Sequence, residues 1–316
     1  MKNLALAAAI LLVLFTSRAT WADEPAASYT RTERVIYGEK DGLSLTMDIF
    51  QPKENGNGRG IVFIVSGGWH SGREMITWLI PQPHEFLRRG YTVFAVMHGR
   101  QPKYTVPEIL PDIHRAVRFI RHNAARYNVD GEKLGVCGAS AGGHLSLMQG
   151  MAGAEGDPNA ADPIDRLSSR VAAVGCFFPP TDFLNYGKEG ESALGEGVLA
   201  RLAAAFDFRE WNSETNRFER VTDTNKRREI GRAISPITHV SADDPPTLII
   251  HGDADALVPI QQAQIIIEKL KSVGVPAKLV VREGKAHGWD GAGWASQVEP
   301  IADWFDEHLR SAVAGQ

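Results

Sequence analysis

Gly138-Ala139-Ser140-Ala141-Gly142 is the stretch of this sequence that decides the fold. It follows an apolar run, Leu134 to Cys137, and precedes a segment of helical character that begins near Ala141. A strand that turns sharply into a helix, with serine at the apex, is the context that makes Gly-x-Ser-x-Gly a nucleophile elbow. Side chains at the two glycines would collide with the adjoining strand and helix, so the spacing has a steric reason. The alternative is a glycine-rich turn without a role, and the rest of the chain decides between them.

Apolar runs and amphipathic segments alternate on both sides of this stretch. The runs Ile61 to Val65, Tyr91 to Met97 and Val171 to Phe178 are typical of strands covered on both faces. A helix ending at Arg88-Arg89 and another from Pro107 to about Asn123 are expected between them. The alternation predicts an α/β fold with a mostly parallel central sheet and helices on both faces. Ligands then bind at the carboxyl ends of the strands.

The two ends of the chain complete this pattern. Alternating apolar residues between Val35 and Ile49 predict an opening antiparallel hairpin that turns at Asp41-Gly42. After residue 235 the rhythm resumes, and the sequence ends with a strand, a helix, a strand and a closing helix. Their expected ranges are 247–250, 259–273, 277–281 and about 298–309.

The rhythm breaks between Asp182 and about Ser235. This segment contains a glycine-rich piece, a short helix at Val198 to Phe206 and a charged part with Trp211 and Phe218. It is too long for a simple connection, which predicts a cap-like insertion that borders the site. A surface excursion without a role is the alternative. We therefore expect one catalytic domain over residues 23–316, with the insertion at about 182–235.

Composition excludes several classes of protein. The 316 residues are 43% apolar and 23% charged, which is ordinary for a globular chain and argues against extensive disorder. The formal net charge of −4 gives no electrostatic reason to expect nucleic acid or an anionic membrane as a partner.

The first residues predict export from the cytoplasm. Lys2 precedes an apolar run from Leu4 to Phe15, and the small residues Thr20 and Ala22 stand at the −3 and −1 positions of a cleavage site before Asp23. Residues 1–22 are therefore expected to be a signal peptide, and the mature protein to be secreted or periplasmic and free of the membrane. An uncleaved anchor is the alternative, but the run is short for a full span.

The chain has two cysteines, Cys137 and Cys176, and both lie in apolar runs. Export would permit a disulfide between them. Neighbouring strands seldom offer the geometry of a bridge, so we expect two buried free thiols.

Two late loops carry residues that a serine nucleophile needs. The strand at 247–250 is followed by His251-Gly252-Asp253-Ala254-Asp255-Ala256-Leu257-Val258-Pro259, and the strand at 277–281 by a loop containing Ala286-His287-Gly288. A serine hydroxyl requires a base, and the base requires an acid that fixes its tautomer. The order serine, acid, histidine along the chain is that of the α/β-hydrolases. From about Ile61 to Leu309 the sequence resembles this superfamily, particularly its esterase and lipase group.

The resemblance implies roles for individual residues. Ser140 would be the nucleophile, Asp255 the acid and His287 the general base. Asp255 is preferred over Asp253 because it precedes x-x-Val-Pro, whereas Asp253 is expected to hydrogen-bond within the turn. The remaining loop histidines are expected to be structural or to line the pocket, and they are His70, His98, His144 and His251. A metal site formed by His251 and the two aspartates is an alternative that no other metal motif supports.

The loop after the strand at 61–65 reads Ser66-Gly67-Gly68-Trp69. Many relatives have His-Gly-Gly-Gly-Trp there, and the two later glycines match while the leading histidine and first glycine do not. The resemblance implies an oxyanion hole formed by backbone N–H groups of Gly67, Gly68 and Ala141. The departure leaves open which of the loop's N–H groups donates.

The resulting hypothesis is a secreted serine hydrolase that cleaves short-chain carboxylic esters through an acyl-enzyme and requires no cofactor or metal. Within the superfamily the sequence is similar to acetyl-xylan and feruloyl esterases, so an ester linked to a polysaccharide is one expected substrate. Trp69 and Trp289 are candidate substrate-binding residues, although either could be a core residue. The alternatives are a peptidase similar to prolyl oligopeptidase and a hydrolase-fold binding protein without activity.

Overall fold

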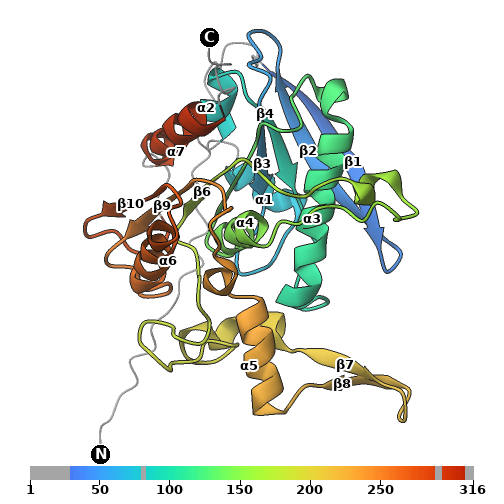
Figure 1. The fold of residues 1–316 in the computed structure, drawn as a ribbon, viewed down its shortest axis with the longest axis vertical. Coiled ribbons are helices and arrows are strands. Elements are labelled where there is room, and N and C mark those ends of the chain that lie inside the picture. Colours follow the sequence, from blue (N-terminus) through green and yellow to red (C-terminus); the bar gives the residue numbers. More distant parts are fainter. Residues whose placement is uncertain (1–28, 80–82, 289–293, 310–316) are drawn as a thin grey trace, which may run out of the picture.

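The computed structural model describes residues 29–79, 83–288 and 294–309. One sheet has the strand order β1-β2-β4-β3-β5-β6-β9-β10 (Figure 1). Pairing is antiparallel for β1 with β2 and β2 with β4, and parallel for all other neighbours. The bounds are β1 Tyr29–Lys40, β2 Leu43–Pro52, β3 Gly60–Ile64, β4 Thr92–Val96, β5 Leu134–Ala139, β6 Ala173–Phe177, β9 Thr247–Gly252 and β10 Ala277–Arg282. The predicted opening hairpin and mostly parallel sheet are confirmed.

Helices cover both faces of this sheet, and an apolar core lies under each layer. Ile76 of α1, Phe86 of α2 and Phe305 of α7 belong to one core. Ile113 of α3, Leu145 of α4 and Ile266 of α6 belong to the other. The helix bounds are α1 Arg73–Leu79, α2 Pro83–Arg88, α3 Val106–His122, α4 Ala141–Met151, α6 Gln261–Ser272 and α7 Trp294–His308. The central strands are apolar throughout because both of their faces are covered in this way.

One predicted helix differs from the structure. The segment expected to form a single helix ending at Arg88-Arg89 contains two, α1 and α2, and α2 begins at Pro83. Proline has no backbone N–H and fixes its own φ, so it is favoured at the first position of a helix and disfavoured in the interior. The closing helix α7 begins about one turn earlier than expected.

The insertion forms a separate layer beyond the carboxyl ends of the strands. It contains the 3₁₀ segment η3 (Gly197–Phe206), the two-stranded hairpin of β7 (Arg209–Asn212) and β8 (Arg217–Arg220), and α5 (Thr224–Ala233). Figure 1 shows β7 and β8 projecting together away from the central sheet. The hairpin was not predicted, because its strands are short and mostly charged. We refer to β7 and β8 as the arm.

The two cysteines are buried free thiols, as expected. In the parallel pair β5–β6, Cys137 lies opposite Gly175 and Cys176 opposite Gly138. This offset of one residue turns the two side chains to opposite faces of the sheet, and each belongs to a different core. Burial raises the pKa of the Cys137 thiol, so both groups behave as small apolar side chains.

The described part of the chain lacks two kinds of feature. It contains no helix long and apolar enough to cross a membrane. It also contains no group of three or more side chains of the kinds that hold metal ions. The expected signal peptide lies outside the described residues.

Three histidines in the fold are held in the neutral form. Burial lowers the pKa of His98, His114 and His144 to about 4 in each case. In the unfolded chain a histidine binds its proton near pH 6.5. As the pH falls below this value, these histidines bind protons in the unfolded state but not in the folded state. The free energy of unfolding therefore decreases.

We therefore expect a steep loss of stability between pH 6.5 and 5. Each histidine adds up to about 1.4 kcal/mol per pH unit to the slope. Urea unfolding at several pH values measures it. His98→Gln should reduce the slope by one histidine's share whatever its effect on the free energy of unfolding at neutral pH. An equal slope in the wild type and His98→Gln would contradict the explanation.

Candidate active site

Ser140 lies at the apex of the turn that joins β5 to α4. Its φ of 54° and ψ of −119° are a strained conformation for a residue with a side chain. A Cβ atom added to Gly138 would lie 2.5 Å from the Gly142 carbonyl oxygen. One added to Gly142 would lie 2.8 Å from the Ile64 carbonyl oxygen. Only glycine fits at both positions, so the pentapeptide has the geometry of a nucleophile elbow.

The structure brings Ser140, His287 and Asp255 into one hydrogen-bonded relay. The Ser140 Oγ lies 2.9 Å from His287 Nε2, and His287 Nδ1 lies 2.7 Å from Asp255 Oδ2. With a proton on Nδ1 donated to the carboxylate, Nε2 is free to accept from the serine hydroxyl. The three residues, up to 147 positions apart along the chain, come together because β5, β9 and β10 are parallel and end at the same edge of the sheet.

The environment of Asp255 keeps it ionised. Its side chain is fully buried, and burial alone would raise its pKa. The hydrogen bonds from His251 and His287 outweigh burial, so the pKa of Asp255 is well below its ordinary value. Backbone N–H groups of Leu257 and Val258 donate to its second oxygen at 2.9 and 2.8 Å. The carboxylate is therefore a fixed acceptor for the imidazole.

Asp253 lies in the same loop as Asp255 but makes different hydrogen bonds. Its Oδ1 accepts from the backbone N–H of Gly284 at 2.6 Å, and the Ala254 N–H donates to the Lys285 carbonyl at 3.1 Å. Both bonds join the acid loop to the loop that carries His287. The expectation that Asp253 makes a local hydrogen bond is corrected in detail: the bond reaches the next loop, where it positions the base loop.

His251 is the second histidine beside the acid. Its Nε2 lies 2.8 Å from the Val258 carbonyl and 3.4 Å from Asp255 Oδ2, so it carries a proton directed at both. Its ring is wholly buried, and its polar contacts are with the acid loop itself, at the Val258 carbonyl and the Asp255 carboxylate. The expected structural role holds, and the contact with the acid is one that sequence reasoning missed.

The loop after β3 forms a tight turn of four residues. The Gly67 N–H donates to the His70 carbonyl and the His70 N–H to the Gly67 carbonyl, both at 3.0 Å. The central residues Gly68 and Trp69 have φ values of 54° and 60°, which together with the two bonds define a type I′ turn. One predicted donor is thereby corrected: the Gly67 N–H is already used inside the turn.

Three other N–H groups remain for an oxyanion. Within the described residues, no acceptor is bonded to the N–H of Gly68, Trp69 or Ala141. Ala141 is the first residue of α4, where N–H groups have no partner in the helix. The Gly68 carbonyl accepts from Gln101 Nε2, and a trans peptide then directs the Trp69 N–H away from Gln101. The Trp69 N–H is a candidate that the sequence gave no reason to consider, since it depends on the turn type.

Trp69 itself is a core residue. Its side chain is 1% exposed, and its ring packs against Phe183 and Phe206 of the insertion, with centroids 5.8 and 5.1 Å away. Its Nε1 donates to His144 Nδ1 at 3.3 Å, while His144 Nε2 donates to the Ile234 carbonyl at 2.7 Å. The expectation that the Trp69 side chain binds substrate is therefore wrong. It anchors the turn to α4 and to the insertion.

Two further expectations concern the insertion and Trp289. The insertion does border the site: an added Cβ on Gly68 would lie 2.9 Å from Leu202 Cδ2 of η3. Trp289 lies outside the described residues, so its expected contact with substrate stays a prediction.

Gln101 is the residue of this site that sequence reasoning missed. Its side chain is 4% exposed. Its Nε2 donates to the Gly68 carbonyl, and its backbone N–H donates to the Trp69 carbonyl at 3.2 Å. These two bonds hold the central peptides of the type I′ turn. They provide the support that the missing histidine and glycine left in doubt.

Replacing Gln101 with methionine should lower kcat for ester hydrolysis by about ten- to a hundredfold with little change in KM. Methionine keeps the length of the side chain but cannot donate to the Gly68 carbonyl, so the turn is less well positioned for a developing oxyanion. Steady-state kinetics on p-nitrophenyl acetate measures the split. Gln264→Met, at an exposed position of α6, is the matched control. A rise in KM at unchanged kcat would contradict the positioning role.

The fold and the hydrogen-bonded relay together define an α/β-hydrolase. Comparison with known families agrees: residues 47–270 match the model of the BD-FAE family, and the chain belongs to this family.

Several of the similar proteins of known sequence or structure are esterases. The chain is 25% identical over 252 residues to the probable carboxylic ester hydrolase LipM of Mycobacterium tuberculosis, covering 78% of this chain and 53% of LipM. The chain spans about half to two thirds of the length of the curated relatives it matches.

Two solved structures are similar over most of both chains. A truncated carbohydrate esterase from gut microbiota is 25% identical with a TM-score of 0.71, over 89% of this chain and 97% of its own. Esterase 2 of Thermogutta terrifontis, with propionate bound, is 26% identical with a TM-score of 0.67, over 92% and 97%. The predicted α/β-hydrolase fold is confirmed.

Proposed function

We propose that this chain is a serine carboxylesterase that hydrolyses short-chain, acetyl-type esters through an acyl-enzyme, with acylated polysaccharides as one class of substrate. The observation that carries the proposal is the relay from Ser140 Oγ through His287 to the buried Asp255, with contacts of 2.9 and 2.7 Å. The similarity to esterases supports the same reaction, and one of them, Thermogutta esterase 2, has also been described phosphorylated by paraoxon.

In the first half of the reaction His287 Nε2 takes the proton of Ser140 as Oγ forms a bond to the ester carbonyl carbon. Asp255 stabilises the resulting imidazolium. The carbonyl oxygen becomes an oxyanion and accepts from the N–H of Ala141 and from the turn, at Gly68 or Trp69. When the intermediate collapses, the bond to the alcohol oxygen breaks, and His287 returns the proton to the departing alcohol.

In the second half a water molecule enters. His287 takes its proton as the water oxygen attacks the acyl carbon, and the bond to Ser140 Oγ breaks as His287 protonates that oxygen. The carboxylic acid leaves, and the enzyme is restored. These steps need no redox change and no group beyond the side chains and N–H groups named here.

Hydrolysis of p-nitrophenyl acyl esters from acetate to decanoate tests the proposal. We expect turnover that is highest for the shortest acyl groups and release of acetate from acetylated xylan. A well-folded chain without turnover on any of these esters would overturn the esterase proposal. The remaining candidate functions would then be hydrolysis of peptides and binding without catalysis.

We further propose that residues 1–22 direct export and are removed before Asp23. Amino-terminal sequencing of the protein recovered from outside the cytoplasm tests this. A chain that retains Met1 and stays inside the cell would contradict it.

A further inference from the structure

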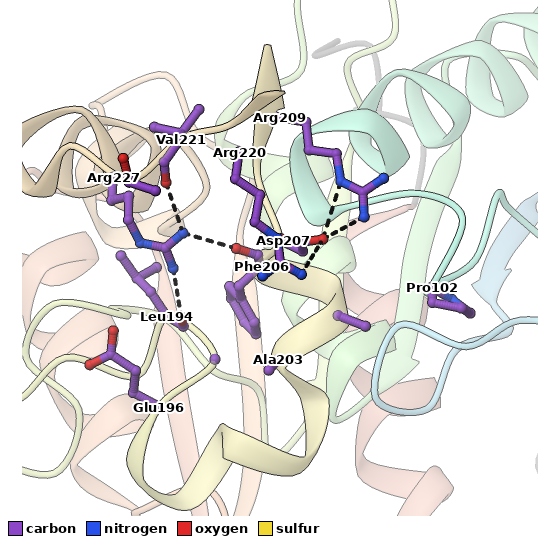
Figure 2. Close-up of a pocket in the computed structure, with 13 residues that line it drawn as sticks. Pro102, Leu194, Glu196, Ala203, Phe206, Asp207, Arg209, Arg220, Val221 and Arg227 are labelled. Atoms are coloured by element: carbon purple, nitrogen blue, oxygen red, sulfur yellow. Dashed lines mark hydrogen bonds and ion pairs between the residues drawn. The ribbon is translucent and has the colours of Figure 1, made fainter. Parts of the chain in front are cut away.

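The region between the arm and the loop after β4 contains two neighbouring cavities, of about 660 and 380 Å³. Both are lined by Pro102, Asp207 and Arg209. Figure 2 shows the larger one, with the arginines of the arm directed at Asp207. We call these two adjoining cavities the arm groove. We call the type I′ turn at residues 67–70 the oxyanion turn. None of the roles assigned so far to this turn or to the relay uses the arm groove.

The inner end of the arm groove adjoins the oxyanion turn. Pro102 follows Gln101, which holds the carbonyls of Gly68 and Trp69. On the opposite wall, Ala203 follows Leu202, the residue of η3 that lies over Gly68. Each wall of the groove is thus one residue along the chain from a side chain that contacts the turn, on the side of the turn where Gln101 holds the Gly68 carbonyl.

The outer end carries two exposed aromatic rings. Trp211 and Phe218 are cross-strand partners on the arm, with ring centroids 5.3 Å apart. Their exposed fractions are 52% and 67%, and Phe218 lines the smaller cavity. The two rings meet edge to face, at 71°, and together they form an apolar patch rimmed by charged residues, the kind of exposed patch that marks a binding surface. The exposed faces of these rings offer apolar area to the C–H faces of pyranose rings.

Polar groups along the arm groove are fixed by one another. Arg209 Nε and Nη2 donate to Asp207 Oδ2 at 3.1 and 2.5 Å, and Arg220 Nε lies 2.6 Å from Oδ1. Burial would raise the pKa of Asp207, but the hydrogen bonds from the two arginines lower it. The result is a fixed cluster of two guanidinium groups and a carboxylate, whose remaining N–H groups and lone pairs suit neighbouring hydroxyl groups.

The charged residues that line the groove limit the classes of ligand that it can bind. Four acidic and four basic side chains line the two cavities, and they are Asp41, Glu108, Glu196, Asp207, Lys103, Arg209, Arg220 and Arg227. One of the bases, Arg227, is directed at main-chain carbonyls, with its Nη2 donating to Leu194 at 3.1 Å. A balanced lining gives no attraction for a polyanion such as nucleic acid. It favours a neutral ligand rich in hydroxyl groups.

We propose that the arm groove binds the polysaccharide chain to which the ester is attached, with pyranose rings stacked on Trp211 and Phe218. This inference rests on the proposed function, because it assigns the alcohol part of that ester. The groove would hold the polymer while the acyl group reaches Ser140.

Kinetics on polymer and small esters provides the first test. In Trp211→Ala/Phe218→Ala we expect the ratio of kcat/KM on acetylated xylan to kcat/KM on p-nitrophenyl acetate to fall about tenfold. Trp211→Tyr/Phe218→Tyr keeps the flat rings and should keep most of the ratio. Ile36→Ala, at an exposed apolar position on β1, is the control. An unchanged ratio in the alanine pair, or an equal loss in the tyrosine pair, would overturn the proposal.

Binding without turnover separates this proposal from the esterase proposal. The Ser140→Ala chain should be retarded in native gels that contain xylan, glucomannan or pectin, and adding the alanine pair should remove the retardation. Retardation by at least one polymer supports the groove even if no ester is hydrolysed. Lack of retardation by all three overturns it. A change only in molar mass by light scattering would show that the rings join two copies of the chain, which also overturns it.

Discussion

Ser140→Ala will abolish ester hydrolysis, with kcat reduced by at least about four orders of magnitude. The variant removes the only oxygen within hydrogen-bond reach of His287 Nε2 among the described side chains, so no acyl-enzyme can form. Alanine is smaller than serine and lacks only the Oγ, so the elbow should keep its strained backbone. Thermal unfolding at the wild-type temperature would confirm that the fold is intact.

Covalent labelling gives the same prediction an independent readout. A fluorophosphonate should modify the wild type at Ser140 and leave Ser140→Ala unlabelled, because the reagent needs an activated serine. Ser71→Ala is a matched control: that hydroxyl is buried and donates to the Val65 carbonyl at 2.6 Å, so labelling should remain. Labelling of Ser140→Ala at another residue would place the nucleophile elsewhere.

The elbow and the relay could be predicted from the sequence because their determinants are local or topological. The glycines at 138 and 142 are fixed by contacts within a few residues of Ser140 and with one neighbouring strand. Asp255 and His287 follow strands that end at the same edge of a parallel sheet, and the resemblance to the α/β-hydrolases selected them from the other acidic residues and histidines of the loops. The central strands could likewise be predicted, because each is a continuous apolar run in the sequence.

The oxyanion turn could not be predicted in the same detail. Which N–H is free depends on the φ values of Gly68 and Trp69 and on a bond to Gln101, 33 residues away from Gly68. Tryptophan is common both in protein cores and in binding sites. The residues around Trp69 in the sequence gave no indication that its side chain contacts His144. The arm was missed because each of its strands is only four residues long and mostly polar, which is too short a pattern to predict a strand.

Asp255→Asn should lower kcat by about four orders of magnitude, whereas Asp253→Asn should change it less than tenfold. An amide at 255 donates to His287 Nδ1, so the imidazole is held with its proton on Nε2, facing Ser140, and cannot act as a base. At 253 the amide keeps an oxygen that accepts from Gly284, and the base loop stays in place. Steady-state kinetics on p-nitrophenyl acetate, with unfolding curves for both variants, measures the difference. If Asp253→Asn were the more damaging, the acid of the relay would be Asp253, and the geometry at His287 Nδ1 would have to differ from the 2.7 Å contact with Asp255.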